Sequence, residues 1–345
     1  MAVSGRGTTG PVIGVRRYQL DDRFRPPPRR VLAPVDPPRP VTALVGAGGW
    51  SYFAGGLPAY ARAFSFVEVN ATFYRRVSEA RSRLWRRQVP SDFVFSLKVN
   101  REVTHRARLH ATPAARDAFA HDMRVARTLR APYVVLETPA SLPLGGDQLA
   151  GLRDLAGMVP PGLRIGLEAR AHSSGRIPPS AERTMEDLGV LDVVDLSRGP
   201  PRLASDVVYT RLFGKGDHTR YEFDDAELRE IDRAGRDAID VVFAFHGVRM
   251  YRDAARFLTF RRTGSFPPVT GSVGADSLAE VLREDARFPS TREAVLKAHG
   301  WKVVDLDATT RAHAHVLLER LPDRTYGSLD DLLGEARSEG FPTRP

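Results

Sequence analysis

The chain has 345 residues, 42 % of them hydrophobic, which suffices for one large domain and a small one with a true core. It contains no cysteine, which excludes disulfides, thiolate metal sites and cysteine nucleophiles. No apolar run is long enough to cross a membrane, and Pro and Arg interrupt the apolar runs near the N-terminus. We therefore expect a cytoplasmic protein without a signal peptide.

The net charge of +9 comes from 51 basic and 42 acidic residues. Such a balance favours an anionic partner, for example a phosphate ester or nucleic acid, although an Arg-rich chain with ordinary solvated surfaces would give the same value. Residues 1–40 are rich in Pro and Arg and cannot bury a core. We predict that they form a disordered basic leader, either a plain tail or a segment that touches nucleic acid.

From residue 41 onward, short apolar runs alternate with helical patterns. The predicted strands cover residues 41–48, 64–70, 93–99, 133–138, 164–170, 192–197, 206–214 and 240–247. The predicted helices cover residues 58–63, 78–88, 113–130, 147–158, 180–188, 224–238 and 251–262. The connection 198–205 contains two prolines and is expected to be non-helical.

Strands that alternate with helices indicate a parallel sheet, because parallel neighbours need a long crossover. Eight such units over residues 41–262 predict an α/β fold, a closed (β/α)8 TIM barrel. A doubly wound open sheet is the alternative, and the glycines at 46, 48 and 49 follow the first strand as its phosphate turn would. The full GxGxxG pattern is absent, so the barrel is the prediction.

The stretch at residues 64–75, FSFVEVNATFYR, shows most clearly where a site should lie. Its first half predicts a buried strand that contains Glu68. Burial of an unpaired carboxylate costs on the order of several kcal/mol, so Glu68 must meet a partner or a ligand. Asn70 and Tyr74 follow just beyond the carboxyl end of this strand, where TIM barrels carry their chemistry.

Other predicted strands also deliver polar groups to this end. The candidate site residues are Trp50, Glu68, Asn70, Tyr74, Lys98, His105, Glu168, Arg170, Asp195, Arg211 and His246. Glu68, Glu168 and Asp195, together with His105 and His246, form a ligand set suited to a divalent metal such as Zn, Mn or Mg. Without a metal, carboxylate and guanidinium groups of this kind could simply neutralise one another.

His105 is the best general-base candidate, because an imidazole titrates near neutral pH. Lys98, Arg170 and Arg211 suit a phosphate or a carboxylate group. Trp50 and Tyr74 could form an aromatic wall for a base or a sugar, or could equally belong to the core. No HExxH, GxSxG or P-loop pattern occurs.

At these residues the chain resembles the YecE-like family, domain of unknown function 72. The matching segments, within residues 43–262, are GAGGWSY (46–52), FVEVNATFYR (66–75), VPSDFVFSLKVNREVTH (89–105), LEAR (167–170) and VVYTRLFGKG (207–216). The resemblance implies a TIM barrel and no particular reaction. A remote likeness of such barrels to metal-dependent apurinic-site endonucleases implies only a hypothesis.

The family's recurrent polar positions fall on ten of the candidates named above, all except His246. The chain departs from the family pattern at three strand ends. Glu137 stands in place of a glutamine, Phe213 in place of a histidine, and His246-Gly247 in place of paired asparagines. These departures add one acid and move one imidazole.

Residues 263–276, rich in Gly and Pro, are the predicted linker to a second domain. Residues 277–336 resemble domain of unknown function 2795 and predict a small all-helical domain, a size typical of protein-interaction modules. The favoured interpretation is an enzyme that acts on an anionic, phosphate-bearing substrate by acid–base or metal-assisted hydrolysis. The alternative is a non-catalytic module that binds nucleic acid or protein.

Overall fold

The computed structural model describes residues 42–216, 219–236 and 238–341. The predicted basic leader, residues 1–40, lies outside the described residues. Within them, none of the helices has the length and apolar character needed to span a bilayer.

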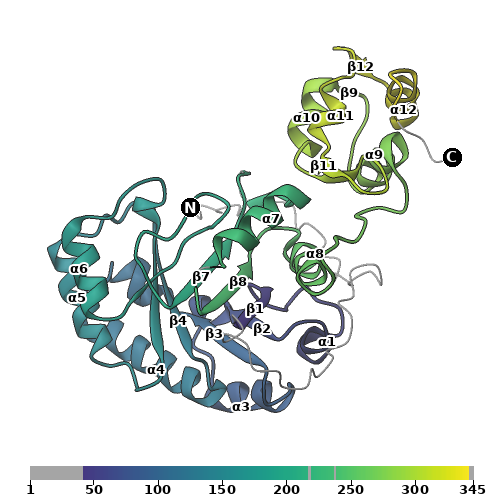
Figure 1. The fold of residues 1–345 in the computed structure, drawn as a ribbon. Helices are drawn as coiled ribbons and strands as arrows, with labels where there is room; N and C mark the ends of the chain where they lie inside the picture. The colour runs from purple at the N-terminus through teal and green to yellow at the C-terminus, as the bar shows by residue number, and fades with distance from the viewer. Residues whose placement is uncertain (1–41, 217–218, 237, 342–345) are drawn as a thin grey trace, which may run out of the picture.

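Eight parallel strands in the described chain form a nearly closed barrel (Figure 1), which confirms the predicted fold. They are β1 (Thr42–Ala47), β2 (Phe66–Val69), β3 (Val94–Lys98), β4 (Tyr133–Thr138), β5 (Arg164–Ala169), β6 (Leu191–Asp192), β7 (Val207–Leu212) and β8 (Asp240–Phe245). Neighbours in sequence pair with one another from β1 to β6, and β8 joins β1 to β7. The ring closes through one parallel bridge between Val194 and Thr210.

The sixth strand is shorter than the predicted 192–197, because Asp195 turns the chain. Its Oδ1 accepts hydrogen bonds from the backbone N–H of Ser197 at 3.0 Å and from the Ser197 hydroxyl at 2.6 Å. Its Oδ2 accepts from the N–H groups of Phe213 and Gly214. An aspartate that binds nearby backbone donors in this way replaces ladder pairing with a turn. The connection that follows is non-helical, as predicted.

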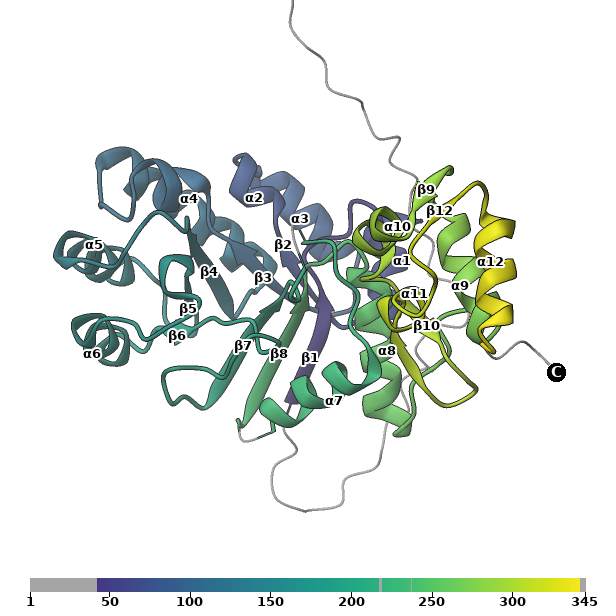
Figure 2. The ribbon, with the colours of Figure 1, turned by 90° about the horizontal axis from the view of Figure 1, so that it is seen from above.

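Helices surround the strands as an outer layer (Figure 2). They are α1 (Gly56–Ala63), α3 (Glu79–Arg87), α4 (Pro113–Leu129), α5 (Gly146–Ala156), α6 (Pro179–Asp187), α7 (Asp225–Ala234) and α8 (Met250–Thr263). Three short helical turns were not predicted: α2 (Ala71–Tyr74), the π-helical η2 (Glu102–Arg106) and the 3₁₀ turn η3 (Arg170–His172). Each of the three lies just beyond the carboxyl end of a strand, so each shapes the rim of the barrel.

The C-terminal region has its own core, which includes Leu278, Leu282, Val304, Tyr326 and Leu332. Its helices within the described chain are α9 (Gly274–Arg283), α10 (Arg292–His299), α11 (His315–Leu318) and α12 (Leu329–Ser338). Two short antiparallel pairs, which the all-helical prediction did not include, join β10 (Val303–Asp305) to β11 (Arg311–His313) and β9 (Ser290–Thr291) to β12 (Thr325–Tyr326).

This small region packs beside α7 and α8 of the barrel (Figure 1). The buried Glu222 side chain, in the loop between β7 and α7, accepts from the N–H of Val303 at 3.0 Å. His313 Nε2 lies 2.8 Å from the carbonyl oxygen of Glu222, and Arg311 pairs with Asp225 at 3.1 Å. The small region therefore holds the loop that leads from the rim into α7.

Candidate functional site

The alternation of side chains along each strand decides which residues enter the barrel. Phe66, Val135 and Tyr209 belong to an apolar cluster formed by the strands. Two positions further along the same strands, the side chains face the same way at the carboxyl end. These next inward residues are Glu68, Glu137 and Arg211, and Lys98 follows Ser96 in the same manner. Four strands thus place charged groups in one layer above an apolar floor.

Arg211 is the centre of this layer, with only 1 % of its surface exposed. Its guanidinium contacts Glu68 Oε1 at 3.0 Å, Glu137 Oε2 at 2.5 Å, and Glu168. Glu137 also accepts from Lys98 at 2.7 Å and from Arg170 at 3.0 Å. Three carboxylates and three cations therefore neutralise one another, which makes their burial tolerable.

The buried carboxylate of Glu68 is paired with Arg211, as its burial predicted. Burial alone would raise the pKa of Glu68, but Arg211 and His246 outweigh that effect and hold the pKa well below its ordinary value. The hydroxyl of Tyr209 donates to Glu68 Oε2 at 2.9 Å, and this hydroxyl lies 2.7 Å from Ser96 Oγ. Glu68 is consequently a fixed anion rather than a proton donor.

His246 lies in the same layer, buried between the opposing charges of Glu68 and Arg211. Its Nε2 is 3.4 Å from Glu68 Oε1, and its ring stacks on Phe213 with centroids 4.9 Å apart. Burial, followed by the repulsion of Arg211, lowers the pKa of His246. A Cβ on Gly48 would lie 2.3 Å from His246 Nδ1, so this close approach of the first loop requires glycine.

His105 stands on the π-helical turn η2, beside the charged layer. Its ring packs edge-on against Phe73 at 5.0 Å, and the Lys98 ammonium lies 3.8 Å from the centroid of the same Phe73 ring. His105 Nδ1 is 2.9 Å from the Thr104 hydroxyl, which leaves Nε2 for a ligand. Burial lowers the pKa of His105; the charge of Glu137 opposes this, and the nearby cations Lys98, Arg170 and Arg101 add to the lowering. π-helical turns occur frequently at functional sites.

The remaining aromatic and amide candidates have separate positions. Asn70 Nδ2 donates to the carbonyl oxygen of Gly48 at 2.8 Å and so ties the first two loops together. Trp50 packs edge-to-face on Trp85 at 5.0 Å and belongs to the wall of the core. Tyr74 is 66 % exposed, so it belongs to the outer surface of the rim rather than to the charged layer.

A cavity of about 920 Å³ opens onto one side of the charged layer. Glu168, Arg170 and Asp195 border it, each at the carboxyl end of β5 or just after β6. Phe213, after β7, lies under both Arg170 and Arg211, whose guanidinium carbons are 5.2 and 5.3 Å from its ring centroid. The outer wall comes from the loops that follow β5 and β6.

The five metal candidates, Glu68, His105, Glu168, Asp195 and His246, do not form one coordination sphere in this arrangement. Nitrogen atoms of Arg211 lie against the carboxylates of Glu68 and Glu168. Asp195 accepts hydrogen bonds from backbone N–H groups, and His105 Nδ1 contacts the Thr104 hydroxyl. Among the described residues, three ligand atoms lie within 4.8 Å of one another only at Asp224, Glu227 and His313. Asp224 and Glu227 cap α7, and His313 binds the Glu222 carbonyl, so these groups already have structural roles.

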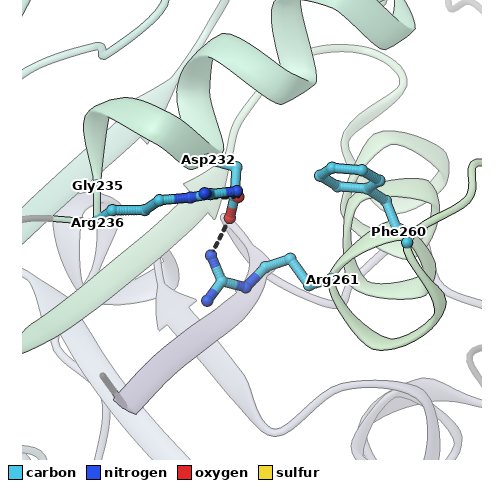
Figure 3. Close-up of a pocket in the computed structure, with 6 residues that line it drawn as sticks. Asp232, Gly235, Arg236, Phe260 and Arg261 are labelled. Atoms are coloured by element: carbon cyan, nitrogen blue, oxygen red, sulfur yellow. Dashed lines mark hydrogen bonds and ion pairs between the residues drawn. The ribbon is translucent and has the colours of Figure 1, made fainter. Parts of the chain in front are cut away.

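A second hollow, of about 390 Å³, lies at the opposite end of the barrel, where α7 and α8 end (Figure 3). Asp232 occupies its centre and pairs with Arg261, and with Arg236 at 2.8 Å. Polar groups at this end of a TIM barrel usually serve stability.

The sequence placed Glu137 at the end of the fourth strand but not among the candidate site residues, and it did not point to the Tyr209–Ser96 pair. Both carried a detectable signal. Glu137 and Glu168 each lie near the end of a predicted strand, and the structure pairs them in the register of β4 and β5. Tyr209 lies two positions before Arg211 on β7, so it faces the same interior.

A closed ring of eight parallel strands with its polar layer at the carboxyl end defines a (β/α)8, or TIM-barrel, protein. The family model described as "Protein of unknown function DUF72" matches residues 51–262, more than half of the sequence. The chain belongs to this family.

Solved structures agree in fold. A DUF72 family protein from Enterococcus faecalis V583 has a TM-score of 0.50 and 15 % identity, over 66 % of this chain and 99 % of that chain. One from Thermotoga maritima MSB8 has a TM-score of 0.51 and 19 % identity, over 64 % and 98 %. Endonuclease IV from Thermus thermophilus reaches 0.39 at 15 % identity over 65 % and 98 %, too low a score to support an inference. No curated protein matches the sequence.

Proposed function

We propose that this protein is an enzyme that acts on an anionic, phosphate-bearing substrate by acid–base chemistry at the carboxyl end of its barrel. The observation that carries the proposal is the cavity of about 920 Å³ that opens onto Glu168 and Arg170. A cavity of this size suits a small organic ligand, and a few convergent charged groups at its floor are typical of active sites.

Exposure separates the roles of the charged residues. The side chains of Glu168 and Arg170 are 14 % and 35 % exposed and reach the cavity, whereas Glu68 and Arg211 are sealed. We assign proton transfer to Glu168 and His105, and binding of the substrate anion to Arg170. Glu68, Glu137, Lys98 and Arg211 then form a fixed electrostatic floor, and Asp195 positions the loop after β7.

The state of His105 supports its role as a base. Because burial lowers its pKa, the neutral imidazole predominates at neutral pH, and this is the form that accepts a proton. The Thr104 hydroxyl holds Nδ1, so Nε2 is the nitrogen that would receive the proton.

We also infer a cytoplasmic location, since the chain has no cysteine. The small C-terminal region is proposed to belong to domain of unknown function 2795 and to serve as a protein-interaction module. A nucleic-acid strand is the alternative source of the phosphate group.

The test is a turnover screen of the full-length protein against sugar phosphates, aryl phosphates and abasic DNA. We expect His105→Ala and Glu168→Gln to lower turnover by roughly a hundredfold or more. The melting temperature should stay close to wild type for His105→Ala and fall for Glu168→Gln, which breaks ion pairs with Arg170 and Arg211 but leaves the protein folded at the assay temperature. His110→Ala is the matched control, because His110 is an exposed histidine in the same loop, and this variant should be silent. Wild-type rates in both folded variants would refute the proposal. Turnover abolished by chelation and restored by a divalent ion would favour the metal-assisted alternative.

A further inference from the structure

Two arginines at the cavity are held by structural acceptors and keep part of their guanidinium groups unbound. Arg198 donates from Nε at 2.9 Å, and also from Nη2, to the carbonyl oxygen of Gly214. Arg170 uses Nε for Glu168 and Nη2 for Glu137. In the described part of the chain, Nη1 of each arginine has no hydrogen-bond partner. Both residues border the cavity, and both lie against the Phe213–Gly214 segment.

Guanidinium groups fixed in this way are suited to a phosphate. The planar fork of arginine binds phosphate oxygens with defined geometry, and less conformational freedom is lost when the side chain is already oriented. Arg176 contributes a third, exposed guanidinium to the same cavity. Arg202, in contrast, is already occupied by Asp192 through its backbone N–H at 2.8 Å and Nε at 2.9 Å.

One further residue of the lining is suited to a different chemical group. Glu182, on α6, borders the cavity, and its carboxylate has no partner among the described residues. A carboxylate repels a bare anion but accepts hydrogen bonds from hydroxyl groups. The cavity is also much larger than a phosphate ion, and Phe213, Pro200 and Pro201 add apolar surface. A ligand that satisfies both the arginines and Glu182 carries a phosphate and at least one hydroxyl group, and the size of the cavity leaves room for more.

We propose that the cavity binds a small phosphorylated polyhydroxy compound of the sugar-phosphate class, with its phosphate on Arg198 and Arg170 and a hydroxyl group on Glu182. This assignment rests on the proposed function for its site and goes beyond it in naming the substrate class. The phosphate of a nucleic-acid strand has the same chemistry, and the experiment separates the two sources.

Binding to the full-length protein is measured by calorimetry with glucose 6-phosphate, ribose 5-phosphate and glycerol 3-phosphate. Glucose, inorganic phosphate and a single-stranded oligonucleotide serve as comparison ligands. At least one sugar phosphate should bind more tightly than glucose and the oligonucleotide. Arg198→Gln should weaken that binding roughly tenfold or more, because a charge-assisted hydrogen bond is lost. Arg176→Gln, at an exposed position where folding is not at stake, should weaken it severalfold.

Glu182→Gln should weaken the sugar phosphate while leaving inorganic phosphate unchanged. Arg183→Gln, exposed on the same helix and outside the cavity, is the matched control and should match wild type. The proposal is overturned if none of the three sugar phosphates binds, if glucose binds as well as its phosphate, if the oligonucleotide alone binds, or if the folded Arg198 and Arg176 variants both behave as wild type. Because binding needs no turnover, loss of binding in Arg198→Gln with full activity in both His105→Ala and Glu168→Gln would keep this subsite and refute the catalytic roles.

Discussion

Among the described residues, the buried charge network at the rim and the one at the junction with the small region have different surroundings. At the rim, Arg211 joins three glutamates, and the outer members Glu168 and Arg170 reach a cavity. At the junction with the small region, Arg256 pairs with Asp225 at 2.6 Å, and Arg311 pairs with Asp225 at 3.1 Å. The three junction side chains are at most 7 % exposed.

The two networks have similar chemistry, so buried charge by itself does not mark a functional site. The rim network is distinguished by its access to a ligand-sized cavity, while the junction network attaches one folded region to another. The comparison predicts that both networks are required for stability and that only the rim network affects ligand binding.

The largest effect is expected from Arg211→Met. Removal of the guanidinium leaves Glu68, Glu137 and Glu168 buried with too few cations, which should cost about 3–5 kcal/mol of unfolding free energy. Urea unfolding measures the loss. The exposed pair of Arg164 with Asp206 provides the control, since Arg164→Met should cost less than about 1 kcal/mol. A loss in Arg211→Met as small as in the control would contradict the central role of this side chain.

Arg256→Met tests the junction in the same way. The variant leaves Asp225 with Arg311 alone, and we expect a stability loss of similar order, about 3–5 kcal/mol. Affinity for the ligand, measured below the melting temperature, should stay at the wild-type value because the junction lies outside the cavity. A tenfold weaker affinity in the folded variant would contradict the prediction that only the rim network affects ligand binding.

Asp122 is a buried carboxylate without a paired cation among the described residues. It therefore differs from the paired carboxylates of the two networks, and the pH dependence of stability should show the difference. Its Oδ2 accepts from the N–H of Asn100 at 2.7 Å. Burial raises its pKa from 3.8 to about 7, and the Asn100 hydrogen bond and the charge of Arg76 only partly oppose this. Between these two values the native state keeps a proton that the unfolded chain has lost, so this group makes stability fall as pH rises through that window.

Asp122→Asn should remove this pH dependence. Relative to the variant, the wild-type protein should lose about 2–3 kcal/mol of unfolding free energy between about pH 5 and pH 8. Urea unfolding at the two pH values measures the difference. Parallel stability curves for wild type and variant would show that Asp122 titrates as an ordinary surface carboxyl.

The smallest effect is expected from Tyr209→Phe, below the rim network. The variant loses the hydrogen bond to Glu68 and the contact with Ser96, at a cost of about 1–2 kcal/mol. Tyr133, whose ring packs edge-to-face on Tyr209 at 5.8 Å, supplies the control, and Tyr133→Phe should change stability by less than about 0.5 kcal/mol. Equal losses in the two variants would mean that the Glu68 hydrogen bond contributes nothing specific.

Much of the barrel could be predicted because its strands are local patterns. Residues 133–138 were predicted as a strand and form β4 with the same bounds. The length of the sixth strand was overestimated. Its pattern of apolar residues does not show that Asp195 binds the backbone of the distant Phe213 and Gly214. The short turns after β2, β3 and β5 were missed for a similar reason, since a few residues contain too little periodicity to distinguish a turn of helix from a loop.

The candidate site, too, was predictable only where it depends on short segments of sequence. The order of apolar runs, and the demand of Glu68 for a partner, follow from the sequence, because periodicity and the cost of buried charge are properties of short segments. Which cation meets Glu68 follows only from ring closure, which brings Arg211 next to it from 143 positions away. The tertiary structure alone decided that Arg211 lies among the glutamates, that Glu137 links three cations, and that Asp195 holds a loop. Partners far apart in sequence leave no periodic trace, so only the closed barrel selects among them.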